Sequence, residues 1–223
     1  MNKLIHKAFA ISLITIFYNI VEGLVSIYFG AGDETLALLG FGVDSFVEVI
    51  SGVGIAHMIF RMKYSKVQAR DDFEKIALKI TGSSFYILTA GLIIGSVLNI
   101  INDSKPETTL PGIVISVISI LTMFWLMTVK LNIGKALHSD AIIADANCTK
   151  TCFYLSFILL AASGLYEIFG IAYFDILGSL GIAYFAVKEG NEAFEKVKSG
   201  KFTCSCDDDC ASEMESSIIK SKL

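Results

Sequence analysis

The sequence predicts an all-α membrane protein with six transmembrane helices and with both termini in the cytoplasm. Three observations lead to this fold class. The chain has 223 residues, of which 54 % are hydrophobic, and soluble domains rarely carry so many uninterrupted apolar runs. The runs are about 20 residues long, which is the length that crosses a bilayer as one helix. Lysine and arginine are concentrated in alternate connections, as the positive-inside rule describes for multi-pass proteins.

The expected helices follow one another with short connections. They cover about residues 8–29, 36–60, 76–101, 111–131, 141–165 and 171–188. The first run follows Lys3 and Lys7 as a signal peptide would, but it is too long for one and is interpreted as a retained helix. The sixth helix is expected to continue as a polar extension toward Lys198. Residues 1–192 are therefore predicted to form one transmembrane domain, and residues 193–223 a short cytoplasmic tail.

Basic residues predict the orientation of this domain. They occur before the first helix, after the second, around the end of the fourth and after the sixth. The other connections are short and mainly acidic, with Asp33 and Glu34 in the first of them. Because cytoplasmic loops carry the excess of lysine and arginine, every basic segment is expected on the cytoplasmic side.

Two carboxylates lie near the middle of the second expected helix. Asp44 and Glu48 are four residues apart, so they share one face of that helix. A carboxylate at membrane depth is costly and is usually functional. Both side chains are expected to face the bundle interior, where they could bind a metal cation or act as a proton relay.

Two thiols lie on one face of the fifth expected helix. Cys148 and Cys152 are four residues apart, with Asp145 on the same stripe. Counting residues from the helix ends places this pair within about one turn of the level of Asp44 and Glu48. Two oxygens and two sulfurs could surround one ion, and tetrahedral thiolate sites favour zinc or a softer metal. The alternative is that the cysteines are small packing residues.

These two segments resemble motifs of the cation diffusion facilitator family, whose members exchange zinc and related divalent metals for protons. Residues 44–48, Asp-Ser-Phe-Val-Glu, resemble the Asp-Ser-x-x-Asp motif of the family's second helix, with Glu in place of the second Asp. Residues 144–152, Ala-Asp-Ala-Asn-Cys-Thr-Lys-Thr-Cys, keep the frame of the fifth-helix motif Ala-Asp-Ala-x-His-x-x-x-Asp. Cysteine stands at both ligand positions of that second motif.

The resemblance extends over about residues 8–192. Asn19 and Gly23 resemble the family's polar-x-x-x-Gly pattern in the first helix, and Phe174-Asp175 resembles the aromatic-Asp pair that opens its sixth helix. The resemblance implies that the protein is a secondary transporter in the cytoplasmic membrane and that it forms a homodimer. It also implies that the protein exports Zn²⁺, or a softer ion such as Cd²⁺, in exchange for protons. The metal is then the substrate, no catalytic or cofactor-binding residue is expected, and neither is a nucleic-acid partner. The family's usual cytoplasmic domain is expected to be missing.

Further polar residues are assigned less central roles. Asn19, Glu22 and Asp145 are expected to line the ion pathway. In the tail, Cys204, Cys206 and Cys210 accompany three aspartates, and they could capture a soft metal or belong to an acidic segment that is simply solvated.

Two other functions remain open at this point. A membrane thiol oxidoreductase could use Cys148 and Cys152, but it would leave Asp44 and Glu48 unexplained. Cysteines on successive turns of one helix are also poorly placed for a disulfide. A metal-responsive membrane protein that does not transport is the other possibility.

Overall fold

The computed structural model of the protein describes residues 2–32, 35–62, 72–103 and 105–199. Six helices occupy nearly all of them: α1 (Asn2–Gly32), α2 (Leu36–Met62), α3 (Asp72–Asn102), α4 (Leu110–Leu137), α5 (Asp140–Phe169) and α6 (Tyr173–Ser199). The all-α prediction is confirmed for this part of the chain, and each expected helix is present. α6 continues without interruption across the predicted domain boundary after residue 192.

Five of the helices are long and apolar enough to cross a membrane, and they indicate a multi-pass membrane protein. These segments are Lys3–Gly32, Leu36–Arg61, Asp72–Asn102, Leu110–Leu137 and Asp145–Phe169. Large apolar side chains such as Phe17, Ile87 and Leu121 are exposed on the outside of the bundle, where a bilayer would cover them. α6 is less apolar than these five segments because its second half is polar, so a sixth membrane span stays a prediction.

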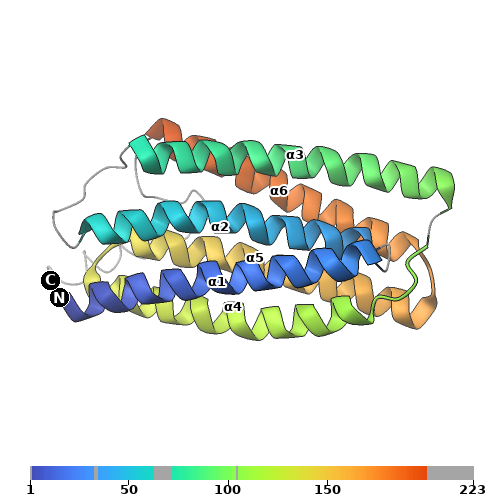
Figure 1. Cartoon of the computed structure of the whole chain (residues 1–223), viewed down its shortest axis with the longest axis horizontal. Helices are drawn as coiled ribbons and strands as arrows, with labels where there is room; N and C mark the ends of the chain where they lie inside the picture. The colour runs from blue at the N-terminus through green and yellow to red at the C-terminus, as the bar shows by residue number, and fades with distance from the viewer. Residues whose placement is uncertain (1, 33–34, 63–71, 104, 200–223) are drawn as a thin grey trace, which may run out of the picture.

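The six helices lie side by side along one axis, with α2 and α5 between the pair α3 and α6 and the pair α1 and α4 (Figure 1). Consecutive helices run in opposite directions (Figure 1). One end of the bundle therefore contains the start of α1, the end of α2 and the end of α6. We call it the basic end, because it carries Lys3, Lys7, Arg61, Lys75 and Lys135. Its cytoplasmic location stays a prediction.

Small residues bring α1 and α2 into close contact. A Cβ atom added at Gly42 would lie 2.8 Å from the backbone nitrogen of Ile27, and one added at Gly23 would lie 2.8 Å from the ring of Phe46. Glycines at such positions let two helix backbones approach closely, which is the main source of helix association in lipid. α2 and its carboxylates are thereby held against α1.

Polar contacts hold α2 at both of its ends. At its start, the buried carboxylate of Asp175 on α6 accepts hydrogen bonds from the backbone nitrogens of Leu36 (2.9 Å) and Ala37 (3.1 Å). At its end, Arg61 donates from Nε (2.9 Å) and Nη2 (2.7 Å) to Oε1 of Glu74, a fully buried residue on α3. The first backbone N–H groups of a helix have no partner inside the helix, so Asp175 acts as a cap supplied by another helix.

Candidate ion site

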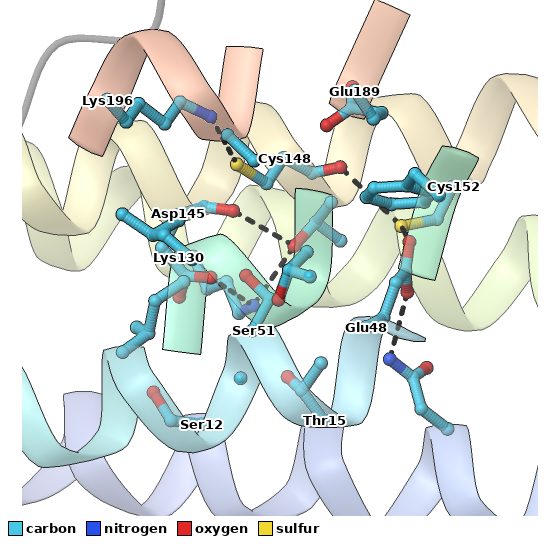
Figure 2. A pocket seen from close by; sticks show the side chains of 18 residues that line it. Ser12, Thr15, Glu48, Ser51, Lys130, Asp145, Cys148, Cys152, Glu189 and Lys196 are labelled. Carbon is cyan, nitrogen blue, oxygen red and sulfur yellow. Dashed lines mark hydrogen bonds and ion pairs between the residues drawn. The ribbon is translucent and has the colours of Figure 1, made fainter. Parts of the chain in front are cut away.

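A polar cavity lies between the helices, from the middle of the bundle toward the basic end. Its volume is about 60 Å³, which is room for a few water molecules or one partly hydrated ion, since a water needs at least about 10–15 Å³. All six helices contribute to its lining (Figure 2). The polar lining residues are Ser12, Thr15, Asn19, Glu48, Ser51, Thr81, Lys130, Asp145, Cys148, Thr149, Cys152, Glu189 and Lys196.

The central contact of the cavity joins α2 to α5. The Cys152 thiol donates a hydrogen bond to Oε1 of Glu48, and the other oxygen of Glu48 accepts one from Nδ2 of Asn19 at 2.9 Å (Figure 2). A carboxylate and a thiol predicted at the same depth in two helices therefore touch. Asn19, predicted as a pathway residue, is their direct neighbour from α1.

Cys148 lies one turn nearer the basic end and has a different partner. Its sulfur is 3.5 Å from Nζ of Lys196 on α6. Figure 2 shows Cys152 directed toward Glu48 and Cys148 directed toward Lys196. Both cysteines line the same cavity, but their thiols have separate partners.

Asp44, the fourth predicted ligand, lies one turn from Glu48 toward the opposite end. It is buried, it is not among the residues that line the cavity, and its Oδ1 atom has no hydrogen-bond partner among the described residues. Across the described part of the chain, no three His, Cys, Asp or Glu side chains are placed to hold a metal ion together. In this conformation two of the four predicted ligands, Glu48 and Cys152, are in direct contact. Cys148 lies one turn away toward the basic end, and Asp44 lies one turn away toward the opposite end.

The cavity also contains charged residues that the sequence prediction did not assign to the site. Lys130 on α4 forms an ion pair with Asp145 (3.0 Å) and a hydrogen bond to Oγ1 of Thr149 (3.0 Å). Asp145, predicted as a pathway residue, is thus part of the lining, with its charge compensated. Glu189 and Lys196 come from the polar half of α6. With Ala193 they recur every three or four residues, which is the spacing of one helix face and a signal that the sequence contains.

Glu22, the remaining predicted pathway residue, lies outside the cavity. It belongs to a second buried polar group between α1 and α2, where Oε1 accepts a hydrogen bond from the Tyr18 hydroxyl (2.8 Å) and Oε2 one from Ser45 (3.1 Å). This group is nearer the opposite end than Glu48 is. The tail cysteines Cys204, Cys206 and Cys210 lie outside the described residues.

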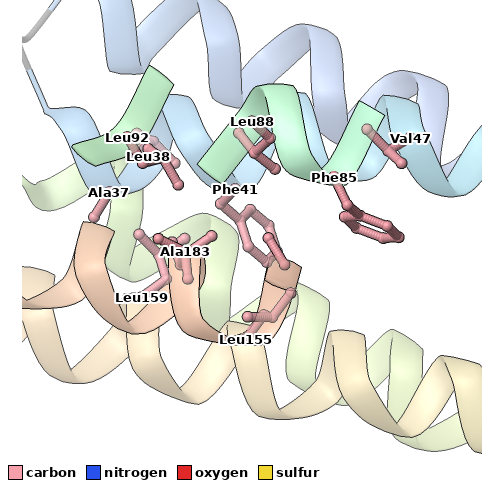
Figure 3. Packing of buried hydrophobic residues seen from close by; sticks show 12 residues of the cluster. Ala37, Leu38, Phe41, Val47, Phe85, Leu88, Leu92, Leu155, Leu159 and Ala183 are labelled. Atoms are coloured by element: carbon pink, nitrogen blue, oxygen red, sulfur yellow. The ribbon is translucent and has the colours of Figure 1, made fainter. Parts of the chain in front are cut away.

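A cluster of apolar side chains adjoins the cavity on the side away from the basic end. The largest buried apolar cluster joins α2, α3, α5 and α6 between the middle of the bundle and the opposite end (Figure 3). Phe85 belongs both to this cluster and to the cavity lining. The cluster consists of Ala37, Leu38, Phe41, Val47, Phe85, Leu88, Leu92, Leu155, Leu159, Ile182, Ala183 and Ala186.

Comparison of the sequence with models of known protein families finds no match, and comparison with curated proteins finds none either. The function is therefore inferred from the residues of the cavity and from the motif resemblance that they carry.

Proposed function

We propose that the protein is a secondary transporter that exchanges a divalent transition-metal ion, Zn²⁺ or a softer ion such as Cd²⁺, for protons. The observation that supports this most directly is the contact between Glu48 on α2 and Cys152 on α5. Carboxylate oxygen and thiolate sulfur are both ligands of zinc-like metals. Both residues also occupy ligand positions of the motifs that resemble those of the cation diffusion facilitators.

The hydrogen bond between these residues suggests how metal and proton exchange. The Cys152 thiol holds its proton against the Glu48 carboxylate, and a metal ion entering between the two atoms would take the place of that proton. Cysteine binds metals as the thiolate, so binding releases protons. Cys148 and Asp44 are one helical turn away on either side, and changes of rotamer would bring them in as the third and fourth ligands.

The shape of the cavity supports alternating access. The cavity reaches from the middle toward the basic end, and the apolar cluster adjoins its other side. With the basic end in the cytoplasm, as the positive-inside rule predicts, the cavity would lie on the cytoplasmic side of the carrier. The metal would enter there and leave on the other side after the helices rock, with protons returning.

The proposal includes α6 as a sixth membrane span. Its first half exposes Leu177 and Tyr184 on the outside of the bundle, as expected of a surface that faces lipid, while its second half contributes Glu189 and Lys196 to the cavity. The protein would then be a multi-pass protein of the cytoplasmic membrane, and a homodimer held by contacts between spans.

Metal binding with proton release tests the proposal. Purified protein in weakly buffered detergent solution is titrated with Cd²⁺ while a pH indicator records protons, and Cd²⁺ flux is followed in proteoliposomes. Glu48→Gln and Cys152→Ser are each expected to weaken binding more than tenfold and to abolish flux, because each removes a direct ligand. Glu107→Gln, which alters an exposed carboxylate at the opposite end, is the control. Wild-type proton release and flux in Cys152→Ser would refute the proposal.

The same assays separate the two alternatives. Cys148 and Cys152 have different hydrogen-bond partners on different helices, so the structure does not favour a thiol oxidoreductase that cycles them as a pair. Thiol trapping would reveal such cycling, whereas a transporter is expected to protect these thiols only when metal is present. A metal-responsive protein that does not transport would bind Cd²⁺ without flux.

A further inference from the structure

The last turns of α6 lie against the cavity and place a lysine beside one of the thiols. Lys196 is only 6 % exposed, and its Nζ atom is 3.5 Å from the sulfur of Cys148 and 3.6 Å from Oε2 of Glu192. Glu192 is itself buried, with 7 % exposed. A residue expected in a solvated cytoplasmic segment therefore lies inside the bundle, with its ammonium directed at a proposed metal ligand (Figure 2).

An ammonium and a metal ion compete for the space beside the sulfur of Cys148. The lysine donates toward the same sulfur that a metal would bind. Two like charges a few ångströms apart also repel strongly where water is scarce, and a divalent ion doubles that repulsion. The charge of Lys196 therefore opposes binding of a metal by Cys148 for as long as the ammonium stays beside the sulfur.

The other lysines near the site are held differently. Lys130 forms its ion pair with Asp145 and a hydrogen bond to Thr149. Lys150 lies over the ring of Tyr154, 5.9 Å from its centroid. Lys196 is paired with Glu192 and is also directed at the sulfur of Cys148, a proposed ligand.

We propose that Lys196 is a tethered competitor of the transported metal, an inference that depends on the transport function proposed above. In the metal-free protein its ammonium occupies the Cys148 side of the site, it leaves when the metal binds, and its return helps to expel the metal. Thiolates hold soft metals tightly, yet a transport site must bind weakly enough to release its ion. Lys196 supplies the repulsion that makes release possible.

The test compares Cd²⁺ binding and dissociation in the wild-type protein and in variants of two lysines of α6. Lys196→Met keeps the apolar stem of the side chain and removes its charge, and Lys196→Gln, measured beside it, removes the charge without adding a thioether that could itself bind Cd²⁺. Both are expected to bind Cd²⁺ about tenfold more tightly, which corresponds to about 1.4 kcal/mol, and to release it more slowly. Lys198→Met removes an exposed lysine two residues away and is expected to leave both quantities unchanged. Lys196→Arg, which keeps the charge, is expected to bind as the wild type does.

The outcomes distinguish this inference from the proposed function. If the wild type binds and transports Cd²⁺ but Lys196→Met binds it no more tightly, the competitor role is refuted and the transporter stands. If the wild type neither binds nor transports Cd²⁺, both proposals fail together. Should Lys196→Met not fold, Lys196→Gln alone decides the same measurement.

A second measurement tests the charge beside Cys148 without any metal. Methanethiosulfonate reagents with an anionic and a cationic head group are applied separately, and mass spectrometry follows their addition to Cys148. A neighbouring ammonium favours the anionic reagent, so the ratio of the two rates is expected to fall several-fold in Lys196→Met. An unchanged ratio would show that Lys196 does not act on this thiol.

Discussion

Replacing Asp175 with alanine is expected to destabilise the bundle by about 3 kcal/mol. The Asp175 carboxylate accepts two hydrogen bonds, from the backbone nitrogens of Leu36 and Ala37, at 2.9 and 3.1 Å. A hydrogen bond to a charged group contributes about 1.5–3 kcal/mol, so two bonds at the lower end of that range give about 3 kcal/mol. The carboxylate also lies at the start of α2, where the helix dipole favours negative charge. Alanine leaves both N–H groups without this acceptor.

Thermal unfolding of the purified protein in detergent, followed by circular dichroism, measures the effect. For a chain of about this size, 1 kcal/mol corresponds to about 2–4 °C in Tm, so Asp175→Ala is expected to lower Tm by about 6–12 °C. Asp175→Asn retains one acceptor oxygen and is expected to lose about half as much. Glu107→Ala removes an exposed carboxylate at the same end of the bundle and should leave Tm unchanged. If Asp175→Ala unfolds at the same temperature as Glu107→Ala, the capping role is wrong.

Two further predictions use the same unfolding assay. Gly42→Ala is expected to lower the free energy of unfolding by about 1–3 kcal/mol, because the added Cβ atom would lie 2.8 Å from a backbone nitrogen of α1. Gly91 has open space around it, so Gly91→Ala is expected to raise the free energy of unfolding by up to about 1 kcal/mol. Equal effects at both glycines would contradict this packing. Lys130→Met is expected to cost about 3 kcal/mol or more, because it leaves the buried Asp145 carboxylate without its ion-pair partner. The double variant Lys130→Met/Asp145→Asn should regain most of that loss, and a double variant as unstable as Lys130→Met would refute the pairing.

Hydropathy was sufficient to predict which segments are helices, but it could not predict where they end. An apolar run reports which residues a bilayer would cover, whereas a helix continues as long as its backbone hydrogen bonds do. α4 therefore extends from the predicted end at residue 131 to Leu137, and Lys130 lies inside the bundle rather than at its surface. The polar extension of α6 toward residue 198 was predicted, and the helix ends at Ser199, but the burial of Glu192 and Lys196 within it was not predicted.

Helical periodicity predicted the central pair of the site but not the whole site. Spacing within one helix shows which residues share a face, and counting along two antiparallel helices brought Glu48 and Cys152 to one level. Which side chain on that face meets which neighbour depends on the rotation of the helices and on the other helices around them. Cys148 contacts Lys196 on α6, and Asp44 is not among the residues that line the cavity. A single sequence contains neither fact.

The charges of the cavity connect proton exchange to the role of Lys196. Lys130 and Asp145 neutralise each other, and Lys196 is paired with Glu192, which leaves the carboxyl groups of Glu48 and Glu189 in the lining. Uncompensated charge is costly at membrane depth, so without metal these carboxyl groups are expected to be neutralised mainly by protons. A divalent ion adds two positive charges to the same space. Its entry is therefore favourable only if positive charge leaves, as protons released from the ligands and as an ammonium that withdraws.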